Sequence, residues 1–378
     1  MGYVIAMFYA ASSIQSLSYY RQKLGNEVAG VAEDDWDGAA SVFPDVHIAS
    51  ACLQKALRRA DRKAAHGAGE ILRIADNARL WRRLTVCVFE DFGLSDLGLT
   101  AEVTTAAASQ DFRRLIGERR LLHHLINRLM EAPKDRRVDD LYVLAARLID
   151  QPSYRDRLEQ AEMARWVVPL IENAVGLARS CERPVPRRSF RALSLAQAVR
   201  ALEAMDLADG GLFELCRTGL RVSNCLLPLL LPLVAQATTQ AGGCGAPQKM
   251  ALPLAPRLGG IPAYVLDGYT RLGRQVLDLL LGQERRLQDL LKASLPKDRP
   301  QICRQLLFFA EGGRCNCLLD DGLARALMVA AVVSGTHQLD QPSAFAAVAL
   351  MGELLPQLHV LRAKAVGRLT STLKEPLP

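Results

Sequence analysis

The sequence predicts an all-α protein, a multi-helix array or bundle that forms two helical domains. Half of the 378 residues are hydrophobic, as in a folded globular chain. Ala, Leu, Arg, Glu and Gln dominate, whereas runs of Val, Ile, Thr and aromatic residues are scarce, which favours helices over strands. Apolar residues recur at spacings of three and four, and no segment alternates as a strand does. A chain of this length is expected to form two domains.

The first helical domain is predicted over residues 46–180, after an irregular N-terminal segment, 1–45. Its clearest helix covers 111–130, where Asp111 is the expected N-cap and Pro133 follows the end. One face of this helix is apolar and is expected to be buried. That face comprises Phe112, Leu115, Ile116, Leu122, Leu125, Ile126 and Leu129.

A break at 181–194, with two prolines and four arginines, is predicted to link this domain to a second helical domain, 195–378. The segment 242–262 is rich in Gly and Pro and is expected to be a long loop. The apolar run Cys225–Ala235 is too short to cross a bilayer, which takes about 20 residues, so a buried helix is expected there. Further helices are predicted over 138–149, 154–178, 262–282, 284–294, 299–310, 319–333 and 342–370.

Charge and cysteine content suggest the compartment and the partners. The formal net charge of +7 favours acidic partners such as nucleic acid or an anionic membrane. The nine cysteines are an odd number scattered through apolar stretches, which indicates reduced thiols in a cytoplasmic protein. The N-terminus lacks the positive segment of a signal peptide, so secretion is not expected. We expect no membrane partner.

Three short segments between residues 47 and 97 resemble a known family. They read LQKALRR at 53–59, LWRRL at 80–84 and EDFGL at 90–94. This stretch resembles part of the C-terminal helical collar of clamp-loader-like AAA+ ATPases, and above all the replication-associated recombination ATPases. The resemblance implies a collar or oligomerisation module with an accessory role in DNA replication or recombination.

Motifs of catalysis and nucleotide binding are missing from the sequence. There is no G-x-x-x-x-G-K-[ST] phosphate loop, so the resemblance does not extend to the ATPase module. There is also no G-x-S-x-G, H-E-x-x-H or G-x-G-x-x-G. The sequence therefore predicts a protein that is not an enzyme and has no cofactor.

A basic stripe on the predicted 111–130 helix is the first candidate nucleic-acid site. Arg113, Arg120, His124 and Arg128 follow one another at i, i+7, i+11 and i+15, away from the apolar face. A row of cationic groups can neutralise phosphates without reading the base sequence. The alternative is a solvated helix face.

Arg79, Arg82 and Arg83 form a second basic group at the predicted start of a helix. Positive charge opposes the helix macrodipole there, which indicates a nearby anion. The anion is either a nucleic-acid phosphate or an internal carboxylate such as Glu70 or Asp61.

The helix after the long loop offers a weaker phosphate site made of Thr270, Arg271 and Arg274. The favoured alternative is an ordinary ion pair between Asp267 and Arg271 at i and i+4. Arginines in the 181–194 segment are a third basic group, expected to be a solvated linker or a flexible arm.

Two further clusters are expected to have structural roles. Glu90 and Asp91 favour a helix-end capping or ion-pair role over acid–base chemistry. Cys315 and Cys317 lack a CxxC spacing and a second paired cluster, so no metal site is predicted.

Together these features favour a non-catalytic accessory protein of DNA replication or recombination. It would contact DNA phosphates or a replication assembly through basic helix faces, and it is expected to form homo-oligomers. The alternative is a helical oligomerising scaffold that binds proteins and has no nucleic-acid role. A third hypothesis, an enzyme that binds a phosphorylated ligand near 267–274, has no catalytic motif behind it.

Overall fold

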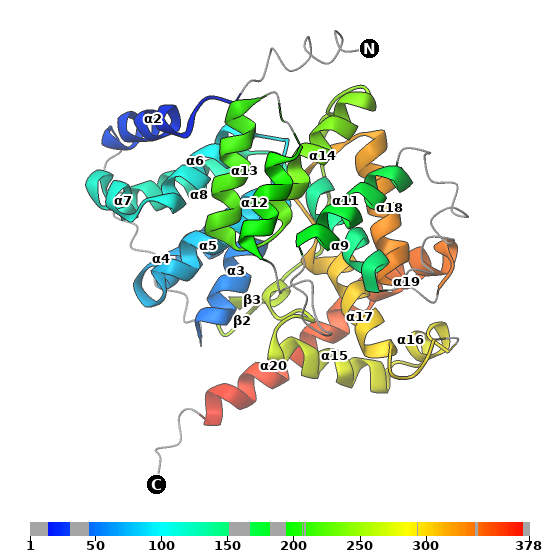
Figure 1. Cartoon of the computed structure of the whole chain (residues 1–378). Coiled ribbons are helices and arrows are strands. Elements are labelled where there is room, and N and C mark those ends of the chain that lie inside the picture. Colours follow the sequence, from blue (N-terminus) through cyan, green and yellow to red (C-terminus); the bar gives the residue numbers. More distant parts are fainter. Residues whose placement is uncertain are drawn as a thin grey trace. The chain divides into compact units, whose positions relative to one another are not determined.

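Figure 1 shows the computed structural model of the chain, which is built mainly of α-helices. The all-α prediction is confirmed, because strands in the described part form only two short antiparallel pairs. The structure describes residues 14–30, 45–150, 167–181, 194–205, 207, 209–292, 294–336 and 339–372.

The chain divides into two compact units, each assembled from separate stretches of sequence. This division differs from the predicted one, in which a linker at 181–194 separates two consecutive domains. Apolar periodicity locates a helix, but it does not specify which distant helix packs against it. Most of the predicted linker, 182–193, lies outside the described residues. Unit 1 comprises Met1–Trp36, Asn77–Lys249 and Cys317–Ala331, and unit 2 comprises Asp37–Asp76, Met250–Asn316 and Val332–Pro378.

Unit 1 is a helical assembly whose central helices are α13 (Gly210–Ser223) and α14 (Leu227–Gln240), which pack against each other. Helix α14 contains most of the apolar run 225–235 and is largely buried, which confirms that prediction. The other helices are α2 (Leu17–Ala29), α5 (Asn77–Asp91), α6 (Leu97–Ala108), α7 (Gln110–Ile116), α8 (Glu118–Glu131), α9 (Arg137–Asp150), α11 (Val167–Cys181), α12 (Leu195–Glu203) and most of α18 (Gly322–Gly335).

Helix α2 lies within the segment 1–45 that the sequence predicts to be irregular, so that prediction is wrong for this stretch. The Ser16 side chain caps the helix by accepting a hydrogen bond from the backbone N–H of Tyr19. Leu24 and Val28 are fully buried, and α2 packs against α6. Tertiary burial therefore stabilises a helix whose sequence has little amphipathic pattern.

The single helix predicted over 111–130 is two helices, α7 and α8. Gly117 separates them with a φ of +89°, a conformation that favours glycine. Ser109, and not Asp111, caps α7 by accepting from the N–H of Phe112. Leu115, predicted to be on the apolar face, is 84% exposed, because the break at Gly117 rotates α7 out of register with α8.

The segment 242–262, predicted to be a loop, contains short strands. In unit 1, β1 (Ala246–Lys249) pairs antiparallel with β4 (Cys317–Asp320), with Gln248 opposite Leu318. Lys134 extends this pairing, since its N–H donates to the carbonyl of Cys317 at 2.9 Å. All four residues of β1 are exposed, so they have no alternation of apolar and polar side chains. The sequence therefore gives no signal for this strand.

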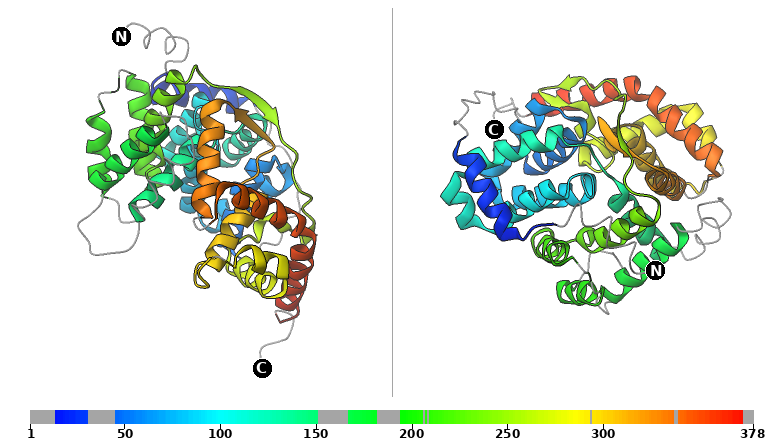
Figure 2. Two further views of the ribbon diagram at one scale, coloured as in Figure 1. Left: turned by 90° about the vertical axis from the view of Figure 1, so that its right-hand side faces the viewer. Right: turned by 90° about the horizontal axis from the view of Figure 1, so that it is seen from above.

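Unit 2 is built around a cluster of buried aliphatic side chains from its C-terminal helices. Helices α3 (Val46–Arg59) and α4 (Arg62–Ala75) form a tightly packed hairpin that turns at Ala60, whose φ is +54°. Figure 2 shows α15 and α20 side by side in this unit. Its other elements are β2 (Arg257–Leu258), β3 (Ile261–Pro262), η1 (Ala263–Val265), α15 (Arg271–Gln283), α16 (Arg285–Leu290), α17 (Arg299–Leu307), the π-helical turn η2 (Phe308–Gly312), α19 (Gln341–Glu353) and α20 (Leu355–Thr372).

The helix predicted over 342–370 is broken at Leu354 into α19 and α20, which bend by 52°. Pro356 lies in the first turn of α20 and has no N–H to continue the hydrogen bonds of α19. Among the described residues, no single helix is long and apolar enough to cross a membrane, and only this bent pair reaches the required length and apolarity.

Two buried ion pairs lie in the core of unit 2. The Arg362 guanidinium donates to both oxygens of Glu311, at 2.9 and 2.7 Å, and both side chains are fully buried. Its Nε also donates to the carbonyl of Leu266 at 2.9 Å. Lys55 pairs with Asp267 across 3.0 Å, and both side chains are almost fully buried. These pairs join helices α3 and α20 to the η2 turn and to the segment before α15.

Replacing Arg362 with Ala leaves the Glu311 carboxylate buried without its main partner. We expect the free energy of unfolding to fall by about 3–5 kcal/mol. Lys364→Ala is the matched control, because that side chain is exposed on the same helix, and its effect should stay within about 0.5 kcal/mol. Urea unfolding followed by circular dichroism measures both, and equal midpoints for the two variants would contradict the prediction.

His359 borders the Glu311–Arg362 pair, and its surroundings disfavour the protonated form. Its Nδ1 accepts from Arg362 Nη1 at 3.1 Å, and its Nε2 donates to the carbonyl of Leu254 at 3.1 Å. Burial lowers the pKa of His359 below its ordinary value, and the neighbouring Arg362 acts in the same direction, although the Glu311 carboxylate opposes them.

Unit 2 should therefore lose stability on mild acidification. Below about pH 6.5 the unfolded chain binds a proton at His359 that the folded chain resists, so the unfolding free energy falls with pH until the folded pKa is passed. Unfolding midpoints measured at pH 7.5 and 5.5 should diverge less in His359→Gln than in the wild-type protein. Identical pH profiles would show that His359 contributes nothing.

Candidate nucleic-acid interface

Glu118 ties together the starts of α5 and α8 and the end of α7. Its Oε1 accepts from the indole N–H of Trp81 at 2.9 Å and from Arg113 Nε at 2.7 Å. Its Oε2 accepts from the side-chain amide of Asn77 at 2.9 Å. The carboxylate therefore fixes the first turn of α5 against the turn between α7 and α8.

Arg113, predicted to contact nucleic acid, is a buried structural residue. Its side chain donates to the carbonyls of Ala106 and Ala107 at 2.9 and 3.1 Å, as well as to Glu118. Its guanidinium also lies over the Trp81 ring, 4.7 Å from the centroid. Because the Arg113 guanidinium is buried and its N–H groups donate to partners inside unit 1, it is not available to bind a phosphate.

The other members of the predicted stripe face carboxylates of α2 and α6. Arg128 pairs with the buried Glu102 at 3.0 Å and with Glu27 at 3.5 Å. His124 lies 3.1 Å from the same Glu27. Arg120 is half-buried beside the turn at Gly117. Internal carboxylates thus neutralise most of this stripe, and the break at Gly117 removes the single helical face on which its spacing was based.

The second predicted group, Arg79, Arg82 and Arg83, occupies the first two turns of α5. The helix begins at Asn77, as the sequence indicated. Arg82 is exposed, whereas Arg79 and Arg83 are half-buried, on the side of α5 away from Trp81. Of the two carboxylates that the sequence offered as internal partners, Glu70 pairs with Arg73 and Asp61 pairs with Arg257.

Arginines of the adjoining α7–α8 turn extend this group. Arg114 is exposed and Arg119 is half-buried. Glu118 holds this turn against the start of α5, so arginines of three helices lie on elements that meet at one junction of unit 1, with those of α5 on the side of that helix away from Trp81. The N-terminal ends of α5 and α8 add positive potential of their own. We call this set the α5–α8 basic surface; it comprises Arg79, Arg82, Arg83, Arg114 and Arg119.

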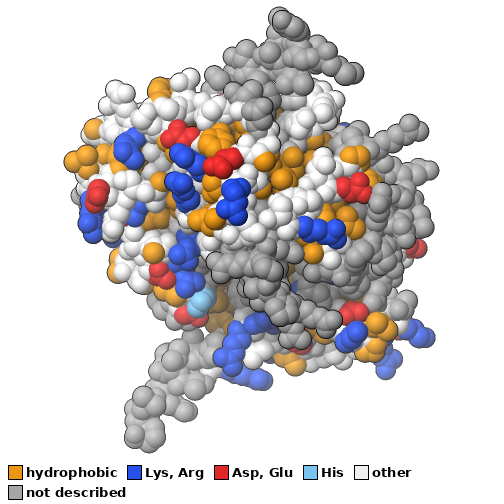
Figure 3. All heavy atoms as spheres, in the orientation of Figure 1, with side chains coloured by type: hydrophobic (Ala, Val, Ile, Leu, Met, Phe, Trp, Pro, Cys, Tyr) orange, Lys and Arg blue, Asp and Glu red, His pale blue; other side chains and the backbone are white. Residues whose placement is uncertain are grey.

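On one face of unit 1 the charges are mixed. On the face drawn in Figure 3, Lys and Arg side chains over unit 1 are interspersed with Asp and Glu side chains and with hydrophobic patches. Such an arrangement is typical of an ordinary solvated surface and provides little attraction for a polyanion. Net positive charge alone therefore does not identify a nucleic-acid site on this chain.

The weaker phosphate candidates lie at the start of α15 in unit 2. Thr270 caps the helix, accepting from the N–H of Gly273 at 3.1 Å and donating to the carbonyl of Asp267 at 3.0 Å. Arg271 and Arg274 are exposed. The predicted Asp267–Arg271 ion pair is wrong, because Asp267 precedes the helix and pairs with Lys55.

The motifs that carry the collar resemblance are largely buried. In the first segment, Arg58 donates to the carbonyl of Gly312 at 3.2 Å, and Arg59 donates to the carbonyl of Pro253 at 2.6 Å. In the last segment, the buried Asp91 pairs with Arg136, in agreement with the preferred ion-pair role. The sequence analysis did not predict that the basic residues of LQKALRR are buried and bonded inside unit 2. The available signal was that these basic residues stand among Leu and Ala residues at helical spacing.

A second buried ionic group in unit 1 also escaped prediction. Arg137 donates to both oxygens of Asp135, at 2.8 and 2.9 Å, and pairs with Asp321 at 3.0 Å. The Lys134 ammonium, fully buried, donates to the carbonyls of residues 129, 130 and 132 at the end of α8. The sequence KDRR at 134–137 reads as a solvated loop, and only its burial reveals the role.

The cysteines offer no metal centre among the described residues, where no group of three or more His, Cys, Asp or Glu side chains is placed to hold an ion. Cys315 is buried and Cys317 lies in β4. Burial raises the pKa of the Cys303 thiol to about 12. The linker arginines of 182–193 lie outside the described residues.

Comparison with known proteins identifies no relative: no family model, curated protein or solved structure matches this chain.

Replacing Glu118 with Gln should loosen the junction of α5, α7 and α8. The amide cannot balance the buried Arg113, so we expect unfolding free energy to fall by about 1–3 kcal/mol. Glu131→Gln, at the exposed end of α8, is the control and should change stability by less than about 0.5 kcal/mol. Thermal unfolding compares the two variants. A Glu118→Gln variant as stable as the control would show that the Glu118 carboxylate does not stabilise the junction of α5, α7 and α8.

Proposed function

We propose that this protein is a non-catalytic accessory protein of DNA replication or recombination that contacts DNA phosphates through the α5–α8 basic surface. One observation carries the proposal: Arg82 of α5 and Arg114 of α7 are exposed to solvent on two helices that Glu118 holds together. The collar-like motifs at 53–59, 80–84 and 90–94 support the replication or recombination context.

This surface suits backbone contact without base readout. Guanidinium groups neutralise phosphates and release condensed counterions, a gain that does not depend on base sequence. Because Glu118 fixes the helix starts, the arginines on them are presented from a rigid support. Binding of this kind is moderate in affinity and weakens steeply as salt increases.

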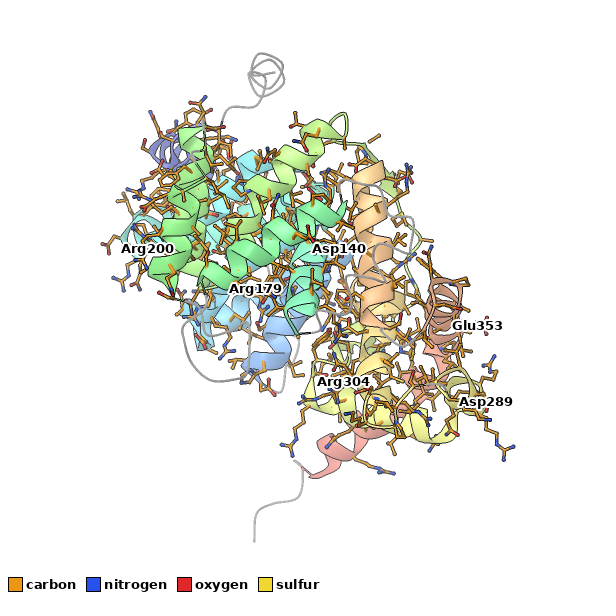
Figure 4. All side chains as sticks on the ribbon, turned by 45° about the vertical axis from the view of Figure 1, so that its right-hand side comes forward. Asp140, Arg179, Arg200, Asp289, Arg304 and Glu353 are labelled. Atoms are coloured by element: carbon orange, nitrogen blue, oxygen red, sulfur yellow. The ribbon has the colours of Figure 1, made fainter. Side chains whose placement is uncertain are left out.

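The combined substitution Arg82→Gln, Arg114→Gln and Arg119→Gln should weaken duplex DNA binding. Each lost phosphate contact should lower the slope of log affinity against log salt by about 0.9, measured by fluorescence anisotropy across a salt series. The matched control replaces Arg179, Arg200 and Arg221 with Gln. All three are exposed in unit 1, and two of them are marked in Figure 4.

Unchanged affinity and slope in the first variant, with both variants folded by circular dichroism, would overturn the proposal. Equal losses in the two variants would also overturn it, since they would reflect net charge and no particular surface. Reversal of Arg113 and Arg128 is unsuitable as a test, because both side chains hold internal ion pairs.

A second function, an oligomerising protein scaffold, is favoured by exposed apolar side chains in unit 2. Leu254 is 90% exposed and Val360 is 54% exposed. The hydrogen bond from His359 to the Leu254 carbonyl keeps the two in one region. Sedimentation of wild-type protein and of Leu254→Ser with Val360→Ser distinguishes this role: a smaller assembly in the variant supports it, and a wild-type monomer with DNA affinity excludes it.

A further inference from the structure

Unit 2 presents an aromatic side chain that is both exposed and held in place. Tyr269, just before α15, is 57% exposed. Its ring meets Phe308 edge-on, with centroids 6.1 Å apart and planes at 88°. Its hydroxyl accepts from the Gln305 side-chain amide at 3.0 Å, and its N–H donates to Asp267 Oδ1 at 3.0 Å. The ring is thus supported from two sides while much of its surface faces solvent.

The residues that contact Tyr269 are themselves held in place by further contacts. Asp267, which anchors the Tyr269 N–H, is itself fixed by the Lys55 ion pair. Phe308 opens the π-helical turn and stacks edge-on with Phe309, 5.5 Å between centroids. Such π-helical turns are frequently associated with functional sites. The support therefore reaches back into the buried core of unit 2.

Three arginines lie near Tyr269, two of them in the first turn of the helix that follows it and one against the preceding Gly268. Arg271 and Arg274 are exposed in the first turn of α15. Arg304 of α17 lies against Gly268, where any side chain would collide with it, 2.7 Å from the nearest carbon. Figure 4 marks Arg304 beside α15.

The local charge balance is positive. Of the carboxylates nearby in sequence, Asp267 is neutralised by Lys55, and Asp278 lies one turn beyond Arg274 on α15, so one unneutralised carboxylate stands against three arginines. Among the described contacts, Arg304 has one hydrogen bond, a 3.3 Å donation to the Gln301 side chain, and its buried Nε–H has no acceptor. None of these contacts is to a carboxylate, so the Nη atoms of Arg304 can donate to an added anion.

We propose that the surface formed by Tyr269, Arg271, Arg274 and Arg304, here called the Tyr269 face, binds single-stranded nucleic acid. An unpaired base stacks on the Tyr269 ring, and Arg271, Arg274 and Arg304 contact the flanking phosphates. An exposed aromatic ring beside cationic side chains is the combination that binds single strands without base preference. A paired base in a duplex offers no free face for stacking, so the chemistry selects single strands. This inference extends the proposed DNA contact, but it rests on different residues in the other unit.

The test uses the full-length protein and a thymidine oligonucleotide carrying a single 2-aminopurine, alongside a duplex of the same length. Tyr269→Ala should weaken single-strand binding about 5- to 100-fold, and should abolish the change in 2-aminopurine fluorescence that stacking causes. Tyr269→Phe should retain both, because the ring remains. Tyr19→Ala, which removes a tyrosine of similar exposure in unit 1, is the matched control and should bind as wild type.

A second variant, Arg271→Gln with Arg274→Gln, separates phosphate contact from stacking. It should lower the single-strand salt slope by about 0.7 for each lost contact and leave the fluorescence response in place at low salt. Both residues are exposed, so folding should be preserved.

The outcomes distinguish this proposal from the duplex-binding one. Equal single-strand affinity in wild type, Tyr269→Ala and Tyr269→Phe would overturn the Tyr269 site, whatever the duplex result. Tyr269-dependent single-strand binding without duplex binding would uphold it and overturn the α5–α8 surface as a duplex site. Absence of binding to either DNA at low salt would overturn both.

Discussion

The buried Glu311–Arg362 pair is the constraint on which unit 2 depends. Both side chains are fully buried, so removing either leaves a charge that water cannot reach. Arg362 also holds the Leu266 carbonyl, which fixes the segment leading into α15. Through His359 the same guanidinium is connected to the chain near Leu254. Four stretches distant in sequence are therefore positioned by one charged group.

Unit 1 also contains a buried arginine with several partners: Arg137 is bound to Asp135, Asp321 and Thr238. Burial of so many cationic groups changes how the chain's charge must be understood. Part of the +7 net charge sits on side chains committed to internal carboxylates and carbonyls. What remains for a polyanion is the smaller set of solvent-facing arginines, and this set, not the total, decides where DNA contact is proposed.

The two proposed contacts differ in chemistry. The α5–α8 basic surface has arginines on helices tied by Glu118, which suits phosphates of any DNA form. The Tyr269 face adds an aromatic ring supported by Phe308, which suits unpaired bases. An accessory factor that meets DNA with exposed single strands would use both kinds of contact, and each can be removed without disturbing the core pairs.

The sequence by itself determined the helical class, the buried helix around Cys225–Ala235 and the start of α5 at its basic group, because composition, apolar periodicity and charge act locally. Tertiary structure decided the rest. Whether Arg113 faces solvent or Glu118, and whether Asp267 pairs with Arg271 or Lys55, depends on helices brought together from distant positions. The break at Gly117 also changed a face that looked continuous. The neighbouring residues in the sequence look the same whether a cationic side chain is buried or exposed. Its role is therefore known only once the tertiary structure shows its burial and its partners.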